Sequence, residues 1–133
     1  MKTIGIIGSR RRDSDKDFVE CKQVFSDIYQ DGDRIVSGHC PQGGDRFAEE
    51  LAEELGLTVE NGKLILHPAD WDKHGRGAGF VRNTNIAEDS DILIAVVAED
   101  RKGGTEDTIK KAIKYNKQIV LVPQPTFDIM NDV

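Results

Sequence analysis

The sequence predicts an α/β fold with a Rossmann-like, doubly wound parallel sheet of five strands and helices on both faces. Short apolar runs rich in β-branched residues alternate with stretches of helical periodicity. Runs that are apolar through most of their length are typical of strands covered on both faces, as in a parallel sheet. Because crossover connections are right-handed, the expected strand order is 3-2-1-4-5.

The strands and helices are expected in strict alternation. The strand pattern occurs at residues 3–7, 34–37, 63–67, 91–97 and 118–122. The first helix is predicted to begin after an N-cap at Ser14, with an apolar stripe of Phe18, Cys21, Val24, Phe25 and Ile28. The second has its stripe at Phe47, Ala48, Leu51, Ala52 and Leu55 and ends at Gly56. The third covers about 79–89, and the fourth begins near Thr105 and buries Ile109, Ala112 and Ile113.

The composition indicates a single soluble domain spanning residues 1–133, with 123–133 as a C-terminal tail. Of the 133 residues, 38% are hydrophobic and 32% are charged, and no stretch approaches the ~20 apolar residues of a membrane span. No signal peptide is evident, and Cys21 and Cys40 are too few for a disulfide framework, so we expect a cytoplasmic protein with no membrane partner. A net charge of −6 makes nucleic acid an unfavourable partner.

Residues suited to ligand binding gather in the four loops that follow the first four strands. Nine of the 13 glycines lie in these loops. Glycine lets a backbone approach a ligand closely, and a helix N-terminus offers unpaired N–H groups to an anion. In an open α/β sheet, ligands bind at the carboxyl ends of the strands where the winding reverses. The expected ligand-binding residues are Gly8, Ser9, Arg10, Gly38, Gly43, Gly44, Asp45, Asp70, Trp71, Asn83, Gly103, Gly104 and Thr105.

Several of these residues also have a purely structural interpretation. One glycine pair alone makes a tight strand-to-helix turn, although four such loops at one sheet edge favour a ligand site. Arg10 is closest to the strand end, whereas Arg11 and Arg12 fit a solvated loop equally well. Trp71 fits either a core plug or a stacking platform for a base, and Asp70 either caps a turn or binds ligand. His39, His67, His74 and Cys40 lack metal-ligand spacing, so no metal is expected.

Two familiar nucleotide motifs are incomplete. Gly38 and Gly43 have the spacing of a Walker A loop, but Gly44 and Asp45 occupy the places of its Lys and Ser/Thr. ATP hydrolysis of that type is therefore disfavoured. Gly5-Ile6-Ile7-Gly8 is not a G-x-G-x-x-G fingerprint, so classical NAD binding is disfavoured too, and no cofactor is expected.

An ordered set of motifs covers about residues 1–122. The motifs are Gly8-Ser9-Arg10, Ser37-Gly38-x4-Gly43-Gly44-Asp45, Pro68-Ala69-Asp70-Trp71, Gly77-Ala78-Gly79-x-x-Arg82-Asn83 and Gly103-Gly104-Thr105. Together they resemble the SLOG superfamily (the SMF/DprA and LOG group), in particular its small YspA-like, cpYpsA-like and YAcAr-type members. The resemblance implies a Rossmann-like domain that binds nucleotides or nucleotide-derived molecules, and a homodimer or higher homo-oligomer.

The resemblance also implies a second function, because LOG relatives are phosphoribohydrolases that cleave the N-glycosidic bond of nucleoside monophosphates. Their arginine has a counterpart in Arg82. Their catalytic glutamate would stand at Thr108, while Glu106 and Asp107 come one or two positions early. Since a one-residue shift turns a helical side chain by about 100°, neither inherits the role directly, and the structural alternative for both is that they complement the dipole at the helix start.

The first expectation is therefore a binding module for a nucleotide or nucleotide-derived phosphorylated small molecule. Gly8, Ser9, Gly103, Gly104 and Thr105 would cradle phosphate, Arg10 and Arg82 would supply charge, and Asp45 or Asp70 would accept from ribose hydroxyls. The alternative is a LOG-like phosphoribohydrolase with Arg82 and either Glu106 or Asp70 as catalytic residues. A DNA-binding module like DprA is disfavoured by the acidic balance.

Overall fold

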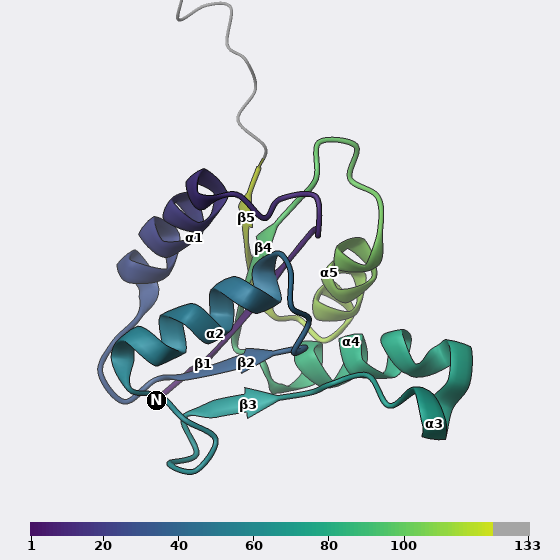
Figure 1. The fold of residues 1–133 in the computed structure, drawn as a ribbon, viewed down its shortest axis with the longest axis horizontal. Coiled ribbons are helices and arrows are strands. Elements are labelled where there is room, and N and C mark those ends of the chain that lie inside the picture. Colours follow the sequence, from purple (N-terminus) through teal and green to yellow (C-terminus); the bar gives the residue numbers. More distant parts are fainter. Residues whose placement is uncertain (124–133) are drawn as a thin grey trace, which may run out of the picture.

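A computed structural model describes residues 1–123 and has the predicted five-stranded, all-parallel sheet in the order β3-β2-β1-β4-β5 (Figure 1). The strands are β1 (Thr3–Gly8), β2 (Arg34–Ser37), β3 (Leu64–Leu66), β4 (Ile92–Val96) and β5 (Gln118–Val122). At the centre of the sheet, Ile4 of β1 lies opposite both Ile35 of β2 and Ile92 of β4. The winding reverses between β1 and β4, so a crevice is expected at their carboxyl ends.

Helices cover both faces of the sheet (Figure 1). They are α1 (Asp15–Ile28), α2 (Gly44–Leu55), α3 (Trp71–His74), a 3₁₀ turn η1 (Gly75–Gly77), α4 (Ala78–Asp89) and α5 (Gly104–Lys114). One apolar core lies under α1 and α2 and includes Phe25, Phe47 and Leu51. A second lies under α4 and α5 and includes Ile86 and Ile109. The parallel strands are therefore buried from both sides, as their apolar runs predicted. The predicted burial of Ile113 is wrong, because its side chain faces away from the second core and is 61% exposed.

The helix boundaries follow the local signals in the sequence. The Ser14 hydroxyl accepts the N–H of Asp17 at 3.1 Å, and the Asp17 carboxylate accepts the N–H of Ser14 at 3.3 Å, which forms a capping box. Helix α2 ends at Gly56, whose φ of +70° is left-handed. Both predictions are confirmed.

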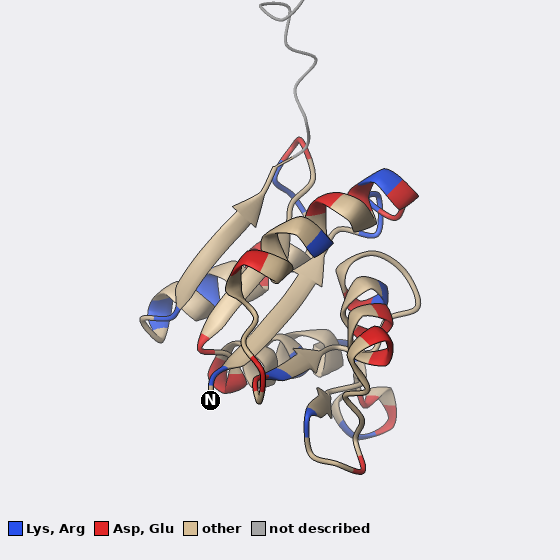
Figure 2. Cartoon of the chain, turned by 90° about the vertical axis from the view of Figure 1, so that its left-hand side faces the viewer, with Lys and Arg blue, Asp and Glu red and all other residues tan. Residues whose placement is uncertain are grey.

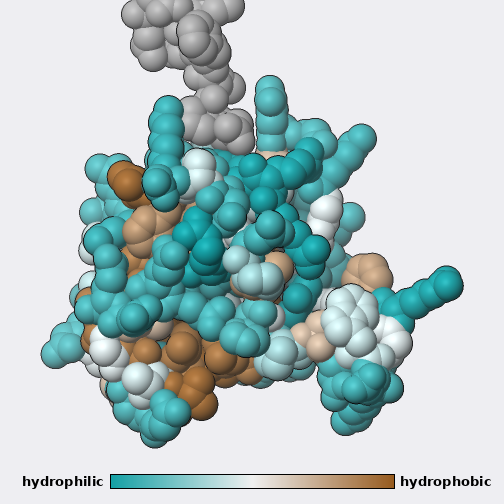
Figure 3. Space-filling model, viewed as in Figure 1, coloured by the Kyte–Doolittle hydropathy of each residue, from teal (hydrophilic) through white to brown (hydrophobic). Residues whose placement is uncertain are grey.

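The structure departs from the sequence prediction around β3. This strand spans three residues rather than five and pairs only with β2, at one edge of the sheet. Its side chains are half-buried. In Figure 3 an apolar area lies below α2, where β3 forms the sheet edge. The short α3 and the η1 turn that follow were not predicted, since four residues are too few to show a helical period.

Almost all charged residues lie on the helices and loops and not on the strands (Figure 2). Arg34 is the one charged residue in the five strands. No helix found between Met1 and Pro123 combines the length and the apolar character needed to cross a membrane. The predicted C-terminal tail lies outside the described residues apart from Pro123.

The solvated-loop interpretation of Arg12 is wrong, because its side chain is only 1% exposed. The guanidinium forms ion pairs with Asp17 at 3.0 Å and Glu20 at 2.9 Å. It also donates to the backbone carbonyls of Val97 and Val122. Arg12 therefore ties the loop after β1 to the carboxyl ends of β4 and β5. Because its charge is paired and its donors have partners, the buried Arg12 side chain is held in one position and has a structural role.

Candidate functional site

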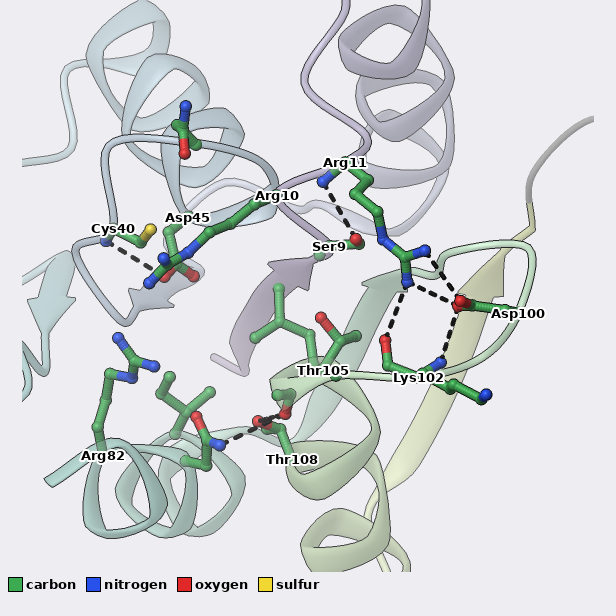
Figure 4. Close-up of a pocket in the computed structure, with 17 residues that line it drawn as sticks. Ser9, Arg10, Arg11, Cys40, Asp45, Arg82, Asp100, Lys102, Thr105 and Thr108 are labelled. Atoms are coloured by element: carbon green, nitrogen blue, oxygen red, sulfur yellow. Dashed lines mark hydrogen bonds and ion pairs between the residues drawn. The ribbon is translucent and has the colours of Figure 1, made fainter. Parts of the chain in front are cut away.

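A cavity of about 490 Å³ lies at the carboxyl ends of β1 and β4, where the winding reverses (Figure 4). Its walls come from the loops after β1, β2 and β4 and from helices α2, α4 and α5. Nine residues expected from the sequence line it: Gly8, Ser9, Arg10, Asp45, Arg82, Asn83, Gly103, Gly104 and Thr105. The volume falls within the range typical of small-molecule sites.

Eight further residues line the cavity without having been predicted. They are Ile7, Arg11, Cys40, Gln42, Ile86, Asp100, Lys102 and Thr108. Of these, Arg11, Gln42 and Lys102 adjoin residues that were expected, so proximity to the glycine-rich loops was an available signal. Thr108 occupies the position that the LOG resemblance gives to glutamate, and it is 2% exposed.

The N-terminus of α5 forms one side of the cavity. Gly103 and Gly104 begin the helix, and within the described chain no side chain caps it. The Glu106 N–H donates to the Gly103 carbonyl at 3.2 Å, whereas the N–H groups of Gly104 and Thr105 remain available at the positive end of the helix dipole. The Thr105 side chain lies near Ser9 in Figure 4. This side of the cavity offers N–H and hydroxyl donors to an anion.

An ion pair between Arg11 and Asp100 joins two of the loops at the cavity wall. The Arg11 guanidinium donates to both carboxylate oxygens of Asp100, at 2.6 and 2.9 Å. The Lys102 N–H also donates to Asp100, at 3.1 Å. The hydrogen bond from Arg11 is the main cause that lowers the pKa of Asp100 to about 2. The charges of Arg11 and Asp100 therefore compensate each other at neutral pH.

Arg82 and Asp45 form the opposite side. The Asp45 carboxylate accepts the N–H of Cys40 at 3.2 Å, which fixes it inside the loop after β2. Burial raises the pKa of Asp45 above its ordinary value, and the nearby Arg82 opposes this shift. The Nε atom of Arg82 is buried and has no hydrogen-bond partner within residues 1–123. Figure 4 shows Arg10 and Arg82 extending toward Asp45 from two different elements.

Three of the predicted glycines lie behind the cavity wall instead of lining it. A Cβ on Gly44 would stand 2.1 Å from the carbonyl carbon of Ile7. On Gly43, whose φ is +73°, it would stand 2.6 Å from the Ser9 oxygen. These two glycines let α2 begin directly against the end of β1. On Gly38 a Cβ would stand 2.9 Å from both Arg82 Cδ and Asp45 Oδ2, so Gly38 makes room for that pair.

Asp70, Trp71 and Glu106 also lie outside the cavity lining. Asp70 accepts the N–H of Lys73 at 3.0 Å and caps α3, which agrees with its structural interpretation. Trp71 is 60% exposed, so the core-plug interpretation is wrong. Glu106 forms a double hydrogen bond with Arg101, with both distances 2.9 Å. The carboxylates that do line the cavity are Asp45 and Asp100.

Within residues 1–123, no group of three or more His, Cys, Asp and Glu side chains is arranged to hold a metal ion. A comparison with models of known protein families finds no match for the chain, and neither does a comparison with curated proteins.

Proposed function

We propose that the protein binds a nucleotide or a nucleotide-derived phosphorylated small molecule in this cavity. The observation that carries the proposal is a local excess of positive charge in a chain of net charge −6. Three arginines line the cavity against two carboxylates, and one of these carboxylates already pairs with Arg11. The uncapped start of α5 adds a partial positive charge. An anionic group is the ligand chemistry that such a site favours.

The phosphate is assigned to the start of α5, where the amides of the first turn and the Thr105 hydroxyl donate to it. Helix N-termini bind phosphate through unpaired N–H groups and the helix dipole. The remaining volume, lined by Ile7 and Ile86 among others, accommodates the nucleoside. Asp45 is the carboxylate proposed to accept from its hydroxyl groups, since Asp70 caps α3 and lies outside the lining.

A thermal-shift series tests the proposal, with AMP and adenosine as a matched pair of probes. We expect AMP to raise the melting temperature and adenosine to raise it much less. Thr105→Val, which removes the hydroxyl and keeps the shape, reduces the AMP shift. The control Thr84→Val lies on α4 outside the cavity lining and leaves the AMP shift unchanged. Equal shifts from AMP and adenosine would contradict a phosphate site.

A nucleoside monophosphate phosphoribohydrolase is the second candidate function, and Asp45 is the observation in its favour. Cleavage of an N-glycosidic bond needs a carboxylate that stabilises the oxocarbenium-like transition state or activates water. Of the two carboxylates lining the cavity, Asp45 is the one not paired with Arg11. Glu106 is held by Arg101 outside the lining.

Chromatography of AMP incubated with the protein separates the two functions. The binding function predicts no release of adenine. If the wild-type protein releases adenine, and Asp45→Asn abolishes that release while Glu106→Ala leaves it unchanged, the protein is an enzyme and Asp45 is its carboxylate. If Glu106→Ala abolishes the release of adenine, the catalytic carboxylate is Glu106, as expected from the sequence.

A further inference from the structure

Two separate groups of anion-binding atoms face the cavity. The first, here the α5 pole, consists of the first-turn amides of α5 with the Thr105 hydroxyl. The second, here the arginine pair, consists of Arg10 from the loop after β1 and Arg82 from α4. In Figure 4 the arginine pair extends toward Asp45 on one side, and Thr105 lies to the other side below Ser9. A single phosphate at the α5 pole leaves the arginine pair without an anion.

The arginine pair is only half compensated by the protein. The ion pairs formed by arginines in the described chain involve Arg11, Arg12, Arg46 and Arg101, and none involves Arg10 or Arg82. Asp45 is the one carboxylate on this side, and its Oδ2 already accepts the Cys40 amide. Two guanidinium groups beside one carboxylate leave one positive charge. Arg82 is partly buried and Arg10 is exposed, and each can form charge-assisted hydrogen bonds with an anion that it contacts directly.

The position of Arg82 is fixed by packing. A Cβ on Gly38 would stand 2.9 Å from Arg82 Cδ and 3.1 Å from Ile86 Cδ1. The stem of Arg82 is therefore confined between α4 and the loop after β2. Its Nε is buried and has no hydrogen-bond partner within residues 1–123.

We infer that the ligand carries two separated anionic groups, one bound at the α5 pole and the other between Arg10 and Arg82. This inference rests on the proposed function and specifies its ligand class as a nucleoside with phosphates at two separate positions. The two phosphates of a nucleoside diphosphate are adjacent and reach only one group of donors. A 3′,5′-bisphosphate places its phosphates at opposite ends of the ribose and can reach both.

Calorimetric titration with three probes tests the inference at fixed ionic strength: AMP, ADP and adenosine 3′,5′-bisphosphate. We expect the bisphosphate to bind about 10- to 100-fold more tightly than AMP, the gain typical of charge-assisted hydrogen bonds. ADP, which has a similar total charge, is expected to fall well short of the bisphosphate. Comparison with ADP therefore separates placement of the second phosphate from charge alone.

Variants of the arginine pair identify the donors. Arg10→Gln and Arg82→Gln should each bring the ratio of bisphosphate to AMP affinity close to one. The control Arg76→Gln changes an exposed arginine outside the cavity lining and should keep the wild-type ratio. The unchanged melting temperature of each variant without ligand shows that it is folded.

The outcomes distinguish this inference from the function on which it depends. The inference of two separate anion sites is wrong if AMP and the bisphosphate bind the wild-type protein with equal affinity, or if ADP binds as tightly as the bisphosphate. The proposed single phosphate site is unaffected by either result. If neither compound binds, the proposed function fails as well. A ratio that survives both arginine substitutions would also overturn the inference.

Discussion

Gly44 shows how a residue typical of phosphate loops can act through packing alone. Its Cα lies so close to β1 that a Cβ would stand 2.1 Å from one backbone atom and 2.2 Å from another. Backbone atoms in the centre of a sheet cannot move aside as a flexible side chain can. The glycine is therefore needed for the start of α2 to approach the strand.

Gly44→Ala should lower the free energy of unfolding by about 3 kcal/mol or more, as expected for overpacking against a rigid neighbour. Gly104→Ala is a matched control, because Gly104 is also the first residue of a helix and a Cβ there would meet nothing within 4 Å. Urea unfolding followed by circular dichroism measures both. Equal stability of the two variants would contradict the close packing of α2 on β1.

The two cysteines differ in environment and should differ in reactivity. Cys21 is fully buried, and burial raises the pKa of its thiol to about 12. At pH 8 Cys21 is therefore protonated and inaccessible, whereas Cys40 is partly exposed at the cavity. Native protein should react with one equivalent of Ellman's reagent at pH 8, and AMP should slow that reaction. In denaturant both thiols should react. Rapid reaction of both thiols in native protein would contradict the burial of Cys21.

At the scale of elements, the Arg11–Asp100 ion pair joins the loops after β1 and β4. The pKa of Asp100 is lowered to about 2 in the folded protein. The ion pair therefore stabilises the folded protein at pH values above the ordinary pKa of a carboxyl group. That contribution is lost as pH falls from about 4 toward 2. The difference in melting temperature between wild type and Asp100→Asn should be constant from pH 8 to pH 5 and disappear toward pH 2. A difference that instead changes between pH 8 and pH 5 would contradict this ionisation.

The sequence predicted those elements whose signals are local. The Ser14 cap, the Gly56 end and the apolar runs each depend on a few neighbouring residues, and the strand order follows from general rules of handedness. Helix α3 is too short to show a helical period, and no local signal marks where the pairing of β3 with β2 ends. These features depend on tertiary contacts.

The same distinction applies to the candidate site. Topology places the loop glycines and Arg10 at one sheet edge, so nine expected residues line the cavity. The pairing of Arg11 with Asp100 joins residues 89 positions apart and has no local signal. The pairing of Glu106 with Arg101 was equally hidden, because it depends on the left-handed backbone at Arg101, where φ is +54°.

At the scale of the whole molecule, apolar side chains on α4 and α5 remain exposed. Phe80 and Ile113 are each 61% exposed, and Val81 and Tyr115 are 38% and 36% exposed. Helices α4 and α5 are also joined to each other, through the Asn83 amide and Asp107 at 3.1 Å. We predict that these helices form a two-fold interface between copies of the chain.

Light scattering coupled to gel filtration tests this interface. The wild-type protein should give a mass near twice the 14.8 kDa of one chain. Ile113→Glu, which places a charge at an exposed apolar residue of α5, should shift the protein toward the monomer mass. Val19→Glu is a control at a residue with similar exposure, 60%, on α1. A monomer mass for wild type at high concentration would refute the interface.

The buried Arg12 has a consequence for the order in which the protein becomes functional during its synthesis. Its guanidinium bonds the carbonyl of Val122, which leaves the ribosome 110 residues after Arg12 itself. The cavity likewise needs β1 and β4, which are made at opposite ends of the described chain. A nascent chain that has produced only β1 to β3 has neither the start of α5 nor the carbonyls that hold Arg12. The proposed site is therefore complete only after the start of α5 has emerged, and until β4 pairs with β1 the free edge of β1 is open to other partners.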